Sequence, residues 1–130
     1  MNAYRIPFLP GHRMAVVEVR FGRETTADLL VDTGAQRTVI VPRLAHRLEL
    51  DLESPVGRVD LQGVGGTQRA PICRVDRLAI GAIIVPQHEV LVADMPPVLR
   101  IQGLLGLDVL RRFRVTFEFD TRTLVLREPA

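Results

Sequence analysis

The fold is decided by residues 30–40, which read LVDTGAQRTVI. Apolar residues lie on both sides of an Asp-Thr-Gly turn, so the stretch predicts a strand, a tight loop and a second strand. A turn of this kind is by itself a common way to end a strand. The apolar strands around it would, however, bury the Asp32 carboxylate, whose ionisation is costly in such a setting. A buried acid at the tip of a loop therefore indicates a chemical role.

Strands are predicted outward from this loop in both directions. Residues 15–21 alternate apolar and polar side chains, as a half-buried strand does. A glycine-rich segment, residues 63–67, separates two further strand patterns and predicts a long hairpin. Short helices are predicted from Pro42 and after Gly106. The other predicted strands are residues 27–31, 39–41, 56–61, 70–80, 83–92, 114–120 and 124–127, with a rigid non-strand link at Met95-Pro96-Pro97. A further apolar strand is predicted from Leu104, passing through Gly106 into the second short helix.

The whole chain, residues 1–130, is predicted to form a single domain. Its 130 residues and hydrophobic content of 47% suffice for one core. Aromatic residues make up only 5% and tryptophan is absent, so the core must consist mainly of Val, Leu and Ile, which favour pleated sheet. The prediction is a mostly β fold.

Charge and hydropathy argue against several classes of partner. The formal net charge is +2, and the 17 basic residues, all arginines, are scattered among acidic ones, so no nucleic-acid partner is predicted. No apolar run approaches the roughly 18 residues of a membrane span, and the N-terminus lacks a signal-peptide pattern. We therefore expect a cytoplasmic protein with no membrane partner. The exclusive use of arginine suggests a GC-rich bacterial genome.

No metal site is predicted. His12, His46 and His88 stand far apart without metal-ligand spacing, so each is interpreted as a solvated or packed histidine. Cys73 is the only cysteine, which excludes an internal disulfide, and it lies in a predicted strand. Its expected role is that of a small buried hydrophobic residue.

Residues 30–40 resemble the catalytic loop of retropepsin-like aspartic peptidases. Gln36 differs from the acidic residue usual in the viral enzymes and is similar to the cellular DNA-damage-inducible proteins, which also carry Gly-Ala-Gln. Residues 63–68, GVGGTQ, resemble the flap of these enzymes, and residues 104–110, LLGLDVL, resemble a second motif that packs beneath the catalytic loop. The three motifs stand in the expected order. The resemblance therefore implies a single-lobe retropepsin-like acid protease barrel with a flap hairpin and short helices.

The resemblance also implies an activity and a set of site residues. It identifies the chain as an aspartic endopeptidase that needs no cofactor, with Asp32 as the catalytic residue. A peptide or protein substrate would lie between the active-site loop and the flap. The loop residues are Thr33, Gly34, Ala35 and Gln36, and the flap residues are Gly63, Val64, Gly65, Gly66 and Thr67.

Counting carboxylates predicts a homodimer. Aspartic peptidases use two carboxylates that share one proton, whereas this chain has one Asp-Thr-Gly. Neither Asp94 nor Asp108 is followed by the Thr/Ser-Gly that would repeat the loop, so the second carboxylate must come from a symmetry mate. We expect the C-terminal hairpin and Thr33 to form the interface. The interface side chains would be Val115, Phe117 and Phe119 on one strand, or Leu124 and Leu126 on the next.

Two other functions stay open on the sequence alone. The first is a dimeric peptide-binding or scaffolding module of the same fold that cleaves little or nothing, which Gln36 and the glycine-rich flap permit. The second and weaker one is a nucleic-acid-binding β domain, but Tyr4 is the only tyrosine and a base-stacking surface is missing. Residues 63–67 make a poor phosphate cradle, because no Lys-Ser/Thr follows them and no helix pattern begins there.

Overall fold

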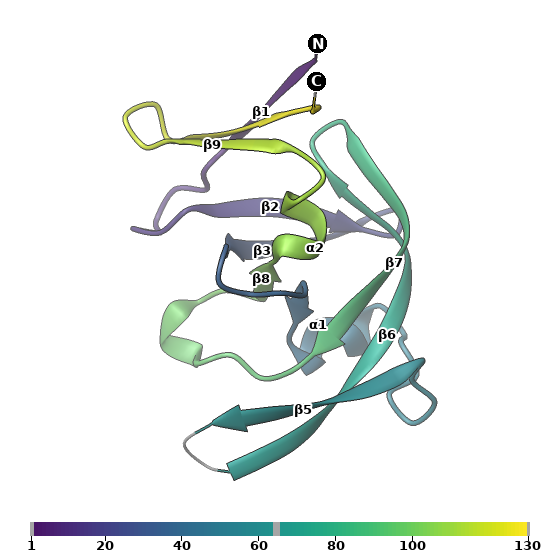
Figure 1. The fold of residues 1–130 in the computed structure, drawn as a ribbon. Helices are drawn as coiled ribbons and strands as arrows, with labels where there is room; N and C mark the ends of the chain where they lie inside the picture. The colour runs from purple at the N-terminus through teal and green to yellow at the C-terminus, as the bar shows by residue number, and fades with distance from the viewer. Residues whose placement is uncertain (1, 64–65, 130) are drawn as a thin grey trace.

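The structure is a computed structural model that describes residues 2–63 and 66–129, and strands dominate it (Figure 1). The strands are rich in Val, Ile and Leu, whose branched side chains suit a pleated, half-buried surface. The described helices are short: α1 (Pro42–Arg47), the 3₁₀ helix η1 (Pro97–Leu99) and α2 (Leu107–Leu110). This composition of elements confirms the predicted mostly β fold.

The larger sheet closes into a barrel. Its strands are β2 (Val16–Phe21), β3 (Thr25–Val31), β4 (Val39–Ile40), β5 (Gly57–Gly63), β6 (Gly66–Ile80), β7 (Ile83–Val92) and β8 (Gly103–Leu105). They follow the order β2-β3-β8-β4-β7-β6-β5, and β2 also pairs with β6, so six of the strands form a closed ring. Closure removes exposed strand edges and surrounds a core of aliphatic side chains such as Val19, Leu29 and Leu78, all fully buried.

The hairpin of β5 and β6 extends beyond the barrel, at the bottom of Figure 1. Its antiparallel register runs from Gly57 opposite Ile72 to Gly63 opposite Gly66. This is the predicted flap hairpin. Its two central residues, Val64 and Gly65, lie outside the described residues.

A second sheet covers one end of the barrel. It consists of β1 (Ala3–Pro7), β10 (Thr123–Arg127) and β9 (Arg114–Glu118), in that order and all antiparallel. The strand β1 was not predicted, because a pattern with a proline at its end carries little periodic signal. Its place is determined by pairing with β10, more than a hundred residues later in the chain.

Candidate functional site

The β3–β4 loop, residues 32–38, holds Asp32 in a defined position. The main-chain N–H of Asp32 donates to the Leu105 carbonyl on β8 at 3.0 Å, which attaches the residue to the neighbouring strand. The Gly34 N–H donates to Asp32 Oδ1 at 2.8 Å, so the carboxylate is turned back over its own loop. A Cβ at position 34 would lie 3.2 Å from that oxygen. Glycine therefore leaves the room that the contact requires.

Asp32 is less buried than its sequence setting predicts. The flanking Val31 and Val39 are buried, but Asp32 is only partly buried, and Thr33 and Gly34 are exposed. The reason is that the apolar strands end at the rim of the barrel and the loop extends past them. The expectation of a buried acid is therefore wrong for the single chain, where the carboxylate stays accessible.

The turn after β8 packs directly beneath the loop. The Leu107 N–H donates to the Ala35 carbonyl at 2.8 Å. A Cβ on Gly106 would lie only 2.6 Å from the carbonyl oxygen of Arg37, so this close approach requires glycine. The motif at residues 104–110 thus lies where the sequence predicts it, under the Asp-Thr-Gly loop.

Gly106→Ala is expected to destabilise the fold. The added methyl group would overlap main-chain atoms of Arg37, and overpacking a well-packed site costs about 1–3 kcal/mol. The free energy of unfolding in urea measures this loss. Gly57→Ala is the matched control, because its Cβ would meet Ile72 at an ordinary 3.6 Å. Equal destabilisation by the two substitutions would contradict the prediction.

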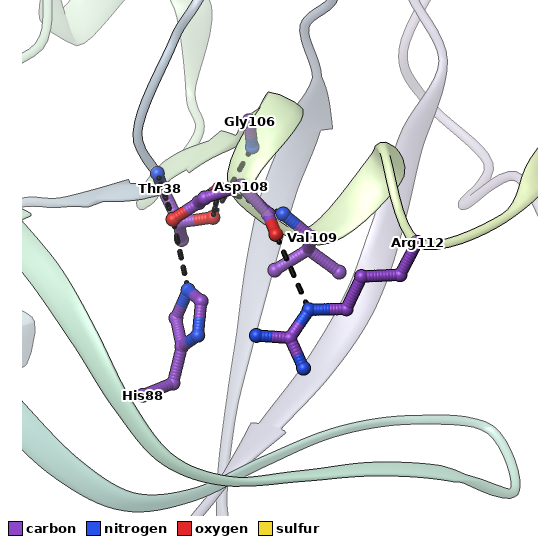
Figure 2. A network of polar contacts seen from close by, with 6 residues as sticks. All are labelled: Thr38, His88, Gly106, Asp108, Val109 and Arg112. Atoms are coloured by element: carbon purple, nitrogen blue, oxygen red, sulfur yellow. Dashed lines mark hydrogen bonds and ion pairs between the residues drawn. The ribbon is translucent and has the colours of Figure 1, made fainter.

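A buried polar network ties the far end of the loop to α2, as Figure 2 shows. Thr38, which is fully buried, donates to Asp108 twice: from its N–H to Oδ2 at 2.9 Å and from its hydroxyl to Oδ1 at 2.8 Å. The Gly106 N–H donates to the same hydroxyl at 3.2 Å. His88, on β7, contacts Asp108 Oδ2 through Nε2 at 2.8 Å. Three separate segments of the chain therefore meet at one carboxylate.

The network keeps Asp108 ionised. Burial raises the pKa of the Asp108 carboxyl, but the hydrogen bonds from His88 and Thr38 outweigh it and hold the pKa below its usual range. The carboxylate can then accept from both groups at once. Because Thr38 belongs to the β3–β4 loop, the charge on Asp108 helps to fix the loop that carries Asp32.

A cavity of about 260 Å³ lies between the loop and β5. The loop side contributes small and polar residues, while β4, β5 and β7 contribute aliphatic side chains that suit an apolar group of a bound molecule. Its lining residues are Ala35, Gln36, Arg37, Val39, Val59, Leu61 and Leu91.

The predicted site residues lie in two groups, one on the β3–β4 loop and one at the end of the β5–β6 hairpin, and among those described only Ala35 and Gln36 line the cavity. The loop group is Asp32, Thr33, Gly34, Ala35 and Gln36. The hairpin group comprises Gly63, Gly66 and Thr67, and the remaining flap residues, Val64 and Gly65, lie outside the described part of the chain. Ala35 and Gln36 reach the cavity from the loop, and β5 borders it from the hairpin side.

Sequence reasoning missed two residues of the network, Thr38 and His88. A threonine inside an apolar run was a usable signal, because a buried hydroxyl needs a hydrogen-bond partner. His88 gave no such signal and was interpreted only as solvated or packed; the structure shows it packed, with 7% of its surface exposed. Its partner Asp108 is twenty residues away, and only the fold brings the two together.

The other predictions on the chain's chemistry concern cysteine, metals and membranes. Cys73 is buried, and burial followed by the charge of Asp51 raises the pKa of its thiol, as suits a packed hydrophobic residue. Within residues 2–63 and 66–129, no three His, Cys, Asp or Glu side chains gather in a way that could hold a metal ion. None of the helices in this part of the chain has the length and apolar character to cross a membrane.

Comparisons with known proteins agree on one family. The sequence model of the aspartyl protease family matches residues 17–109. A retropepsin-like aspartic protease from Rickettsia conorii has the same fold, with a TM-score of 0.70 and 22% identity over 96% of this chain and 89% of that one. The EIAV protease, solved with an inhibitor, gives a TM-score of 0.56 and 23% identity over 79% of this chain and 90% of that one. No curated protein sequence matches the chain significantly.

Proposed function

We propose that this chain, which belongs to the aspartyl protease family, hydrolyses peptide bonds as a homodimer with Asp32 from both copies at the active site. One observation supports this most directly. The Asp32 carboxylate is oriented by the Gly34 N–H at the barrel rim and is still accessible. An oriented, accessible carboxylate can act on a bound water, and a second copy can approach it.

In the proposed mechanism the two Asp32 carboxylates share one proton, because like charges about 3 Å apart cannot both ionise. The ionised member removes a proton from a water held between them, and the protonated member polarises the scissile carbonyl. By family resemblance, the Thr33 hydroxyl forms a hydrogen bond to the loop of the partner, and Gly34 accepts a hydrogen bond from the substrate backbone. Ala35 leaves space beside the carboxylate pair. The step needs no cofactor.

The proposed substrate is an extended peptide with an apolar side chain. The cavity beside the loop is bordered by Val39, Val59, Leu61 and Leu91, which would remove such a side chain from water. The flap, residues 63–67, would close over the peptide and exclude water from the reaction.

We place the proposed interface on the C-terminal hairpin, and burial within the single chain supports one of the two predicted sets of side chains. Leu124 and Leu126 are fully buried within one chain, so they cannot supply the contact. Phe119 is 66% exposed and stacks on Phe117 at a centroid distance of 5.8 Å, with Phe8 beside it at 5.9 Å. Phe119, supported by the partly buried Phe117 and the buried Phe8, therefore presents an apolar surface that a second copy would cover.

Incubation of the purified protein with a peptide library tests the function. Cleavage after or before apolar residues is the expected result. Retained binding of peptides without any cleavage at acidic or neutral pH would favour the rival function, a peptide-binding or scaffolding module. Neither cleavage nor binding would contradict both.

The rate of cleavage is expected to decline as the pH rises through the upper apparent pKa of the carboxylate pair. The pair must keep one shared proton, and at high pH both carboxylates are ionised. A pH profile of kcat/KM measures the decline. A rate that climbs steadily from acid to alkaline pH would show that another chemistry operates.

A further inference from the structure

We propose that His88 is a positioning residue that, through Asp108 and Thr38, holds the catalytic loop in place in acid. Its effect on catalysis rests on the peptidase function proposed above. Its effect on the loop rests on the contacts in Figure 2, which involve no substrate.

The carboxylate of Asp108 attaches the loop to α2, and in both hydrogen bonds to the loop a carboxylate oxygen is the acceptor. Oδ1 accepts from the Thr38 hydroxyl at 2.8 Å and from the Val109 N–H at 2.9 Å. Oδ2 accepts from the Thr38 N–H at 2.9 Å and contacts His88 Nε2 at 2.8 Å. A proton added to either oxygen would face a donor that already points there. Protonation of Asp108 therefore disturbs the set of hydrogen bonds through which the carboxylate holds Thr38.

Water cannot readily replace a lost bond at this place. Thr38 has no exposed surface, and the Thr38 hydroxyl also accepts from the Gly106 N–H. A buried donor left without an acceptor is unfavourable, because nothing replaces the hydrogen bond that it makes with water in the unfolded chain. The loop would then have to shift to satisfy Thr38, and Asp32, six residues earlier in the same loop, would shift with it.

His88 is the side chain best placed to oppose this protonation. From β7, it reaches Asp108 Oδ2 at 2.8 Å with a side chain that is only 8% exposed. From the segment after α2, Arg112 faces the main-chain oxygen of Asp108 at 3.4 Å, but its side chain is exposed and solvent screens it. From the loop, Thr38 is uncharged and its neighbour Arg37 is exposed.

The direction of the pH effect follows from the lowered pKa of Asp108. Burial raises this pKa, and the His88 hydrogen bond is the largest influence that lowers it. A carboxyl whose pKa is lowered by folding stabilises the fold fully above the ordinary aspartate range, near 3.9, and loses that contribution as the pH falls through the lowered value. Without the His88 donor, the Asp108 carboxyl of the folded chain takes up a proton at higher pH, and its contribution to the stability of the fold is smaller. This protonation then overlaps the acidic range in which a carboxylate pair works.

Two variants of His88 test the proposal. His88→Leu removes the donor at similar volume, and His88→Gln keeps an uncharged donor. His46→Gln is the matched control, because His46 is exposed on α1. For each protein, kcat and KM are measured separately across the acidic and neutral range, and the free energy of unfolding is measured at the same pH values.

In His88→Leu we expect the acid side of the kcat profile to move to higher pH. The unfolding free energy should be below that of the wild type at near-neutral pH, and this difference should shrink as the pH falls through the range in which Asp108 takes up a proton. At near-neutral pH kcat and KM should stay close to the wild type, while at the acid midpoint of the wild type kcat should fall severalfold. His88→Gln should lie between, and His46→Gln should match the wild type. In an Asp108→Asn background, His88→Leu should cause no further shift.

Two outcomes would overturn the proposal. One is a His88→Leu variant whose kcat is lowered by the same factor at every pH, which is the behaviour of a merely structural residue. The other is an unfolding free energy with the wild-type pH dependence in both His88 variants. A wild-type protein that cleaves no peptide would instead refute the peptidase function, and the unfolding measurements would still decide the link between His88 and Asp108.

Discussion

Asp32→Asn is expected to reduce kcat by about 10³-fold or more while leaving a folded dimer. The substitution removes the group that shares the proton and acts as base. It keeps nearly the same volume, and the amide oxygen can still accept from the Gly34 N–H, which now bonds to Oδ1 at 2.8 Å. Cleavage of a library-derived peptide measures the loss, and circular dichroism with sedimentation checks the fold and the dimer.

The control for this prediction is Asp76→Asn, which changes an exposed carboxylate on β6 and should leave kcat unchanged. A mixing experiment extends the test. Excess Asp32→Asn protein added to a fixed amount of wild type should lower the activity, because each mixed dimer contains only one of the two Asp32 carboxylates that the mechanism needs. Substantial cleavage by Asp32→Asn alone would remove Asp32 from the mechanism.

Phe119→Asp is expected to weaken the dimer strongly, raising its dissociation constant by about 10-fold to 100-fold, since buried aromatic anchors carry much of the binding energy of an interface. Phe119 is 66% exposed in the single chain, so the substitution should not disturb the monomer fold. Specific activity should then fall at protein concentrations where the wild type is still dimeric. Sedimentation and specific activity, measured along one dilution series for each protein, give the dissociation constants of the wild-type and Phe119→Asp dimers.

Ile84→Asp is the matched control, because Ile84 is another exposed apolar residue, 52% exposed, on β7. Its dimer should resemble the wild type. Deleting the chain after Phe113 is a less clear test, since it would also remove Leu124 and Leu126 from the barrel core. A monomer that cleaves peptide with a specific activity independent of concentration would disprove the shared carboxylate pair.

The periodic segments and the motifs were predictable because their signals are local. Alternation at residues 15–21 predicted β2, and the Asp-Thr-Gly turn predicted the loop between β3 and β4. Gly106 stands where the main chain of Arg37 approaches, so the motif at residues 104–110 reflects a steric requirement that any sequence with this fold must meet. Most element ends differ by a residue or two from the predictions, as is usual where strands and helices fray, and β6 begins four residues earlier than predicted.

What the sequence determined by itself is therefore the mostly β class, the order of the strands from β2 onward and the position of the Asp-Thr-Gly loop, all set by side-chain periodicity and turn chemistry over a few neighbouring residues. The tertiary structure alone decided the pairing of β1 with β10, the partial exposure of Asp32, and the burial of Leu124 and Leu126 beside an exposed Phe119. It also decided the meeting of Thr38, His88 and Asp108, which lie up to seventy residues apart in the chain. Such contacts depend on closure of the barrel, because hydrogen bonds and burial between distant segments leave no periodic trace in either segment.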